Sequence, residues 1–276
     1  MIPKRLQVES LSDIMEHSRR MGVHRYLEGQ STVDSDLLAR ETVIHLYSDS
    51  KKIASLLGTP CDLSALFIGH ALAEGYGLYP NSKITQETTD SGSVILRIDQ
   101  TLTPGKSAEK IVTSSCGACN SDGLDELSEG LPSFNGTHEY FLHDSVYDQL
   151  VLMKKNQTGF RDTGGMHAAA LWSSDTGLNH LSEDIGRHNA VDKSIGKALL
   201  ADESFDSQLL LLSGRCGWDI VAKSARAGIG TIVCIGACST LAADTARLLG
   251  MRIFSFMKPQ SNVGIGVKSH VENNNP

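Results

Sequence analysis

The second half of the chain alternates short, continuously apolar segments with helical patterns, and this alternation restricts the fold more than any other feature. The segments at 208–214, 230–237 and 251–256 contain runs such as LLLL and TIVCI, which are typical of strands buried on both faces. Amphipathic patterns at 218–228 and 239–250 predict helices between them. Strand and helix in strict alternation indicate a parallel sheet built from right-handed crossovers. Ligand sites in such folds gather at the carboxyl ends of the strands.

Three further segments complete the expected second domain. DSVYDQLVLMKKNQ (144–157) predicts an amphipathic helix that Asp144 can cap, and HNAVDKSIGKALLAD (188–202) predicts another. MHAAALWS (166–173) is apolar, and we expect it to be helical, with His167 at the glycine turn that opens it.

The first hundred residues predict a smaller α/β unit. Strands are expected at 41–49 and 93–102, and Asp62 is a candidate N-cap for an apolar helix over 63–77. Residues 1–38 are polar and mixed, which favours an irregular or partly helical arm. The expected organisation therefore has four parts: an N-terminal arm and α/β unit (1–112), a loop or linker (113–136), an α/β domain (137–262) and a C-terminal tail (263–276).

Length and charge exclude several classes of protein. No apolar run in the 276 residues approaches the length of a membrane span, and the charged N-terminal sequence lacks the apolar core of a secretory signal. The formal net charge of −7 does not favour binding to nucleic acid or to anionic membranes. We therefore expect a cytoplasmic protein without nucleic-acid binding or membrane insertion.

The pair Cys116 and Cys119 lies in a stretch rich in glycine and serine, SSCGACNSDG. Such a pair can be a redox dithiol, half of a metal site, a sulfur carrier or two incidental loop thiols. A zinc site would need a second pair of ligands at short spacing, and the next cysteine is Cys216. A thiolate on a loop is the nucleophile that would take up sulfur, although the acidic residues that follow disfavour a thiolate.

Other motifs have both a functional and a structural interpretation. EDIGRHNAVDK (183–193) places Asp184, His188 and Asp192 at helical spacing, either as a salt-bridged face or as an anion site at Arg187 and His188. SGRCGWD (213–219) can be an anion pocket with Arg215 or a plain turn. Three further cysteines and a tryptophan are interpreted as packing residues: Cys216, Trp218, Cys234 and Cys238. A zinc deaminase reads H-x-E, and here Ala169 replaces the catalytic glutamate after His167.

Taken in order, SSCGAC, TGGMHAAAL, EDIGRHNAVDKSIGKALL, SGRCGWDIVAKSARAGI and a last strand running into FMKP resemble the FdhD family, the accessory sulfurtransferases of formate dehydrogenase. The resemblance spans about 40–262. It implies a cytidine-deaminase-like three-layer α/β domain with a mostly parallel sheet, beside the smaller N-terminal α/β unit, and no metal. Deaminase-like domains often pair, so a homodimer is compatible with the resemblance.

The resemblance also implies a function. The family takes sulfur from a cysteine desulfurase as a persulfide and passes it to the molybdenum bis(molybdopterin guanine dinucleotide) cofactor before that cofactor enters apo formate dehydrogenase. Cys116 matches the persulfide cysteine and Cys119 its neighbour. The cofactor-binding segment matches six consecutive residues: Phe256, Met257, Lys258, Pro259, Gln260 and Ser261. Gln260 and Ser261 depart from the Gly-Arg of other members, which removes a positive charge from that segment.

Two alternatives belong to other classes. The chain could be a nucleotide-cofactor-binding chaperone of formate dehydrogenase without sulfur chemistry, in which case Cys116→Ala would leave activation intact. It could also be a zinc hydrolase that uses Cys116, Cys119 and His167. From the resemblance we expect a groove between the Cys116 loop and the strand ends, lined by Arg187, His188 or Arg215.

Overall fold

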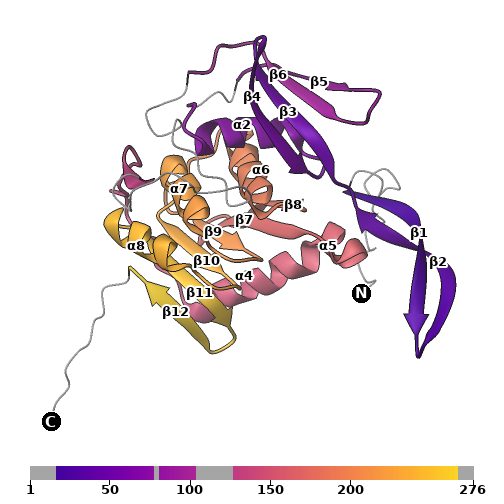
Figure 1. Cartoon of the computed structure of the whole chain (residues 1–276). Coiled ribbons are helices and arrows are strands. Elements are labelled where there is room, and N and C mark those ends of the chain that lie inside the picture. Colours follow the sequence, from indigo (N-terminus) through magenta and orange to yellow (C-terminus); the bar gives the residue numbers. More distant parts are fainter. Residues whose placement is uncertain (1–16, 78–80, 104–126, 267–276) are drawn as a thin grey trace, which may run out of the picture.

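The computed structural model describes residues 17–77, 81–103 and 127–266. Three β-sheets are present in these residues: a two-stranded hairpin, a four-stranded sheet and a six-stranded sheet (Figure 1). The six-stranded sheet forms the centre of the molecule, and the four-stranded sheet lies beyond helix α2 (Leu63–Ala73).

The central sheet has the strand order β12–β11–β10–β9–β7–β8. Its strands are β7 (His167–Ser173), β8 (Gly177–Asp184), β9 (Leu209–Leu212), β10 (Thr231–Cys234), β11 (Arg252–Lys258) and β12 (Ser261–Ile265). β9, β10 and β11 are parallel, as the sequence predicts, whereas β7, β8 and β12 join antiparallel. The sheet is therefore mixed, and the expectation of a mostly parallel sheet is wrong at both edges.

Helices cover both faces of this sheet, which gives three layers. They are α4 (His143–Asn156), α6 (Arg187–Leu200), α7 (Trp218–Ala227) and α8 (Thr240–Leu248), and the short α5 (Thr158–Thr163) follows α4. Leu150 of α4 packs with Leu209 and Leu211 on one face. Leu210 and Leu212 point to the opposite face, where α6, α7 and α8 pack (Figure 1). Alternate residues of one apolar strand thus enter two different cores, as the sequence predicts for a strand covered on both sides.

The smaller unit is a four-stranded sheet of order β4–β3–β6–β5 with α2 on its inner face. Its strands are β3 (Thr42–Ser48), β4 (Lys51–Gly58), β5 (Ile84–Thr88) and β6 (Val94–Ile98). α2 is covered on its other side by α6, and the two backbones approach closely at Gly69 and Gly196. A Cβ on Gly69 would overlap the carbonyl of Asp192, and one on Gly196 would overlap the carbonyl of Ala65.

Two predicted elements are wrong in type. Residues 166–173 were expected to be helical, but 167–173 form β7, whose side chains from Ala168 to Trp172 are at most 5 % exposed. An apolar run that is buried on both sides has no periodicity that separates strand from helix. The N-terminal arm was expected to be irregular, but β1 (Ser18–Leu27) and β2 (Gln30–Ala39) form an antiparallel hairpin that projects from the body (Figure 1). Residues 1–16 lie outside the described part of the chain.

Helix starts and the end of the domain also differ in detail. Asp62 does occupy the N-cap of α2, but its carboxylate makes no capping bond and instead pairs with Lys197 Nζ at 2.8 Å. Asp144 lies within the first turn of α4, and Leu142 is the N-cap. The sequence places the domain's end at residue 262, whereas β12 carries the sheet to Ile265.

Candidate functional site

The carboxyl ends of β9 and β10 lead into two turns that lie side by side. Gly236 N–H donates to Gly214 O at 3.1 Å, and Cys216 N–H donates to Ala237 O at 2.9 Å. A Cβ on Gly236 would come within 2.7 Å of Gly214 O, so the close approach requires glycine. The third turn joins the same edge, because Phe256 N–H donates to Gly236 O at 3.0 Å.

A depression of about 390 Å³ opens at this edge. Its lining includes His167, Ser213 and Ile235. His167 starts β7 and packs over Gly214, whose ideal Cβ position is 3.1 Å from His167 Nδ1. Burial, with Arg187 and Arg215 nearby, lowers the pKa of His167. The edge therefore carries a neutral imidazole within the field of two guanidinium groups.

A larger cavity of about 670 Å³ lies between β4, α2, α6 and α7. Its walls are mostly apolar and include Leu56, Tyr76 and Trp218. Within the described residues, the buried indole Nε1 of Trp218 has no hydrogen-bond partner. A volume of this size, with a few polar groups on mostly apolar walls, is typical of a site for a small organic ligand.

Buried charges form the polar side of this cavity. Lys223 Nζ donates to Glu74 Oε1 at 2.5 Å and to Asp192 Oδ1 at 2.7 Å, and His70 Nδ1 lies 3.1 Å from Asp192 Oδ2. Burial alone would lower the pKa of Lys223, but the two carboxylates hold it above its ordinary value. The same ammonium, together with His70, holds the pKa of Asp192 low despite burial.

These residues also have the donor types of a metal site. The ligand atoms of His70, Glu74 and Asp192 all lie within 4.8 Å of one another, and they form the only such group in the described part of the chain. The Lys223 ammonium already contacts both carboxylates, so it offsets one of the two negative charges that would attract a cation. The chemistry of this donor set is thus that of an internal ion cluster.

His188 and Asp219 form a second pair that faces the same cavity. His188 Nε2 contacts Asp219 Oδ2, and Arg187 lies 3.5 Å from the same oxygen. Burial lowers the pKa of His188, against the attraction of Asp219. Of the three residues expected to line a groove, His188 lines the large cavity, Arg187 pairs beside it, and Arg215 is exposed at the strand ends.

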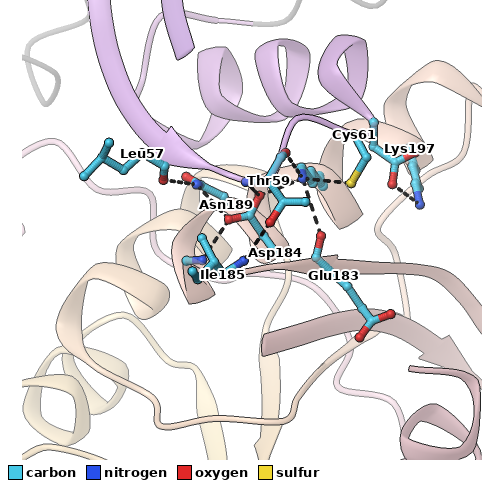
Figure 2. Close-up of polar contacts among 11 residues, drawn as sticks. Leu57, Thr59, Cys61, Glu183, Asp184, Ile185, Asn189 and Lys197 are labelled. Carbon is cyan, nitrogen blue, oxygen red and sulfur yellow. Dashed lines mark hydrogen bonds and ion pairs between the residues drawn. The ribbon is translucent and has the colours of Figure 1, made fainter. Parts of the chain in front are cut away.

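The EDIGRHNAVDK motif mainly joins the smaller unit to the central sheet. Asp184 ends β8, outside α6, so it does not share a helical face with His188 and Asp192. Figure 2 shows Asp184 and Asn189 beneath the segment that leaves β4, close to Thr59. Because several of these side chains are buried and bonded across the two units, we call Thr59, Asp184, Asn189 and Lys193 the junction cluster.

Every member of the junction cluster has several partners. Asp184 accepts from Thr59 N at 3.0 Å and from Lys193 Nζ at 2.6 Å. Lys193 also donates to Thr59 O at 3.0 Å, and Asn189 Nδ2 donates to Leu57 O at 2.8 Å (Figure 2). Lys193 and Asp184 side chains are fully buried. The motif's charged residues thus satisfy each other and the β4–α2 backbone.

The six residues Phe256 to Ser261 form the end of β11, a turn and the start of β12. Phe256 has a φ of 52° and is 45 % exposed, while Met257 is 2 % exposed and packs in the core under α4. Lys258 O accepts from His143 Nε2 at 2.8 Å. Of this segment, the side chain of Phe256 is thus open to a ligand and that of Met257 is not. Cys116 and Cys119 lie outside the described residues.

Comparison with known proteins identifies the family. A sequence model described as FdhD/NarQ family matches residues 39–265, which is most of the chain. The chain belongs to the FdhD/NarQ family. The match begins at the last residue of β2, so it leaves out almost all of the projecting hairpin.

Named relatives of this FdhD/NarQ member support the same family assignment. The chain is 32 % identical over 248 residues to the sulfur carrier protein FdhD of Sulfurisphaera tokodaii, covering 88 % of this chain and 94 % of that one. It is 30 % identical over 259 residues to the protein of the same name from Streptomyces coelicolor, covering 88 % and 92 %.

A solved structure confirms the mixed α/β fold. The crystal structure of a protein from Desulfotalea psychrophila, described as a formate dehydrogenase accessory protein, superposes with a TM-score of 0.69. It shares 22 % identity, with coverage of 90 % of this chain and 96 % of that chain. In the described part of the chain, no helix combines the length and apolar character needed to cross a membrane.

Sequence reasoning missed the buried ion cluster around Lys223. The signal was present in LFIGHALAEG, where His70 and Glu74 are four residues apart in an otherwise apolar helix. Polar residues at i and i+4 share one face of a helix, and in a helix this apolar they need buried partners. The partners, Asp192 and Lys223, come from two other helices, and no spacing in the sequence connects them.

Proposed function

We propose that the chain is a sulfurtransferase that carries sulfur as a persulfide on Cys116. It would take the sulfur from a cysteine desulfurase and pass it to the molybdenum bis(molybdopterin guanine dinucleotide) cofactor before insertion into formate dehydrogenase. The observation that carries the proposal is membership of the FdhD/NarQ family along most of the chain, with curated relatives named as sulfur carriers. The protein would act in the cytoplasm.

The first step is an exchange between two thiols. The Cys116 thiolate attacks the outer sulfur of the desulfurase persulfide, a new S–S bond forms on Cys116, and the desulfurase leaves as a thiolate. Sulfur changes carrier and no outside oxidant is needed. Cys119, three residues on, is proposed to support this step.

The described site supports an acceptor that is large, organic and negatively charged. Gly186 and Gly217 stand at the N-caps of α6 and α7 and make no side-chain cap, and the N-terminus of a helix favours phosphate oxygens. Arg215 is exposed beside them and adds positive charge at this edge. The apolar walls of the large cavity suit a heterocycle, and the exposed ring of Phe256 offers a stacking surface at the strand edge.

The test is intact-protein mass spectrometry after incubation with an active cysteine desulfurase and cysteine. We expect one added sulfur on the wild-type chain and none on Cys116→Ala. Cys119→Ala tests whether the neighbouring cysteine is needed for the uptake of sulfur. Cys234→Ala removes a buried thiol and is the matched control, which should keep the added sulfur.

Activation of formate dehydrogenase is measured in parallel with the same variants. Loss of activation with Cys116→Ala is expected, because a carrier without its acceptor thiol delivers no sulfur. If Cys116→Ala activates the dehydrogenase normally and the wild-type chain acquires no sulfur, the chain is instead a cofactor-binding chaperone.

A further inference from the structure

The depression at the carboxyl ends of β9 and β10 shares no lining residue with the large cavity between α2, α6 and α7. It has a volume of about 390 Å³ and lies where the last turn of α4, the turn between α5 and β7 and the two strand ends meet. Among the described residues, neither Arg215 nor any residue of 256–261 lines it. The depression is therefore a candidate site distinct from the segment proposed for the cofactor.

Gln157 lines this depression with a buried polar side chain. The residue joins α4 to α5 and is 3 % exposed. Its backbone N–H donates to Lys154 O and its carbonyl accepts from Arg161 N–H, but within the described residues its side-chain amide makes no hydrogen bond. Burying an amide without a partner is costly, so packing alone does not account for a glutamine at this position.

His167 contributes a second polar group without a partner to the same lining. Neither of its ring nitrogens makes a hydrogen bond within the part of the chain that the structure describes. Burial, Arg187 and Arg215 lower the pKa of His167, and Asp184 acts in the opposite direction. A neutral imidazole keeps one N–H that can donate to a ligand, and the two guanidinium groups make this place favourable for an anion.

One cation and several apolar side chains complete the lining. Lys154, near the end of α4, carries its only full charge. Met166 is buried, whereas Phe160 and Ile235 are each 39 % exposed. The carboxylate of Glu183 accepts from backbone N–H groups at the start of α5, and it does not line the depression. The lining thus combines one positive charge with uncharged donors and apolar contacts.

A carboxylate matches these groups in charge and in hydrogen bonding. Ser213 Oγ accepts from Ala168 N–H at 2.8 Å, so the serine O–H joins the Gln157 amide and the His167 ring as a donor. A carboxylate is an acceptor only, and it carries the single negative charge that one ammonium can balance. A phosphate dianion would leave one charge unbalanced at Lys154. The apolar side chains suit a short hydrocarbon chain attached to the carboxylate.

We propose that this depression binds a small monocarboxylate with a short hydrocarbon chain. Its carboxylate accepts hydrogen bonds from Gln157 and His167 and lies near the ammonium of Lys154. The ligand is held reversibly, and no covalent bond forms or breaks. The inference goes beyond the proposed sulfur transfer and uses none of the residues on which that proposal depends.

The first experiment compares three probes on the full-length chain by isothermal titration calorimetry: butanoate, butanamide and inorganic phosphate. Butanamide has nearly the shape of butanoate but no charge, and it should bind about tenfold more weakly, because hydrogen bonds to a charged acceptor are the stronger ones. Phosphate should bind more weakly than butanoate. The assignment is overturned if butanoate does not bind, or if butanamide or phosphate binds as tightly.

Variants then locate the site. Gln157→Leu should weaken butanoate binding about tenfold, whereas the melting temperature of the free chain should stay the same or rise, because the amide has no partner to lose. A glutamine with a purely structural role would give the opposite result, a lower melting temperature and unchanged binding. Lys154→Met should weaken binding about threefold, as expected for an exposed charge. The matched control is Lys155→Met, which removes the next, exposed lysine outside the lining and should have no effect.

A spectroscopic readout shows whether the ligand reaches the imidazole. Butanoate should shift the ring resonances of His167, assigned by their loss in His167→Asn, and the shift should need more butanoate in Gln157→Leu. Binding that leaves these resonances unchanged, or that is equally tight in Gln157→Leu and in the wild-type chain, would place the ligand elsewhere and overturn the assignment. Because the test does not involve Cys116, its outcome and that of the desulfurase test are independent.

Discussion

Lys193 offers the sharpest test of the junction cluster, because its ammonium lies fully buried between the smaller unit and the central sheet. The informative change is Lys193→Met, which keeps the length and apolar stem of the side chain and removes its charge. Three oxygens lose a donor: Asp184 Oδ2 at 2.6 Å, Thr59 O at 3.0 Å and Glu183 O at 3.4 Å.

The expected loss is set by the carboxylate left behind. Asp184 would keep its bonds from Thr59 N, Gly186 N and Asn189 Nδ2 but would lose its only contacting cation in the described part of the chain. Breaking a buried ion pair by removing one partner costs about 3–5 kcal/mol of the free energy of unfolding. At roughly 2–4 °C per kcal/mol, the melting temperature should fall by about 6–20 °C.

The assay is urea denaturation followed by tryptophan fluorescence, with Lys197→Met as the matched control. Lys197 lies one turn further along α6, and its side chain is 29 % exposed beside Asp62 at 38 %. Removing that half-solvated pair, with its bond to Leu181 O, should cost only about 1 kcal/mol. Adding Asp184→Asn to Lys193→Met removes the orphaned charge and should recover part of the loss.

The reasoning would be refuted by equal losses in the two lysine variants. That result would mean that the Asp184 carboxylate is solvated or protonated in the folded chain, and that the junction cluster does not depend on the charge of Lys193. A larger loss in the double variant than in Lys193→Met would refute the role given to the orphaned carboxylate.

Two further predictions concern packing and pH. Gly69→Ala should lower the free energy of unfolding by about 1–3 kcal/mol, because the new Cβ meets backbone of α6 that cannot yield without separating the helices. The control Gly22→Ala, where an added Cβ has nothing within 4 Å, should be nearly neutral. Equal losses in the two variants, measured by urea denaturation, would contradict the close contact of α2 and α6. Burial lowers the pKa of His138, with Arg252 adding repulsion, while its ring bonds Thr231 Oγ1 and Gly250 O. The unfolded chain therefore takes up the proton first, and the free energy of unfolding should fall as pH drops below about 6.5. His167 and His188, whose pKa values are also lowered, act in the same direction. In thermal melts between about pH 7.5 and 5.5, His138→Asn should remove the share of this pH dependence that is due to His138.

The sequence predicted the parallel centre of the sheet because the physical signal there is local. β9, β10 and β11 are apolar runs between helices with clear periodicity, and each strand is buried by the helices next to it in the chain. β7 is also apolar and covered on both faces, but it pairs antiparallel with β8 and β9 and has no strand–helix alternation around it in the sequence, and it was predicted as a helix. The hairpin of β1 and β2 was missed because both strands are largely exposed and polar, so they show no alternation towards a core.

The same distinction applies to the candidate site. The glycine turns at 213–217 and 235–239 could be predicted, because a turn between a buried strand and a helix needs only neighbouring residues. The contact between Cys216 and Cys238 depends on the register of two strands, and the cluster of His70, Glu74, Asp192 and Lys223 depends on three helices. Spacing along the chain carries no information about either.

The motif that most strongly resembles the family is thus largely a structural one. Asp184, Asn189 and Lys193 join the smaller unit to the sheet, and Asp192 pairs with Lys223 in the buried ion cluster between α2, α6 and α7. Each is buried, and each would leave an unpaired polar group if replaced, so the fold alone is sufficient to require these residue types. Within the same motif, His188 faces the large cavity and Arg187 pairs beside it with Asp219. Variants at Asp184 or Lys193 should therefore lose the proposed sulfur transfer and stability together, whereas variants at Arg187 that affect this transfer should do so with the fold intact.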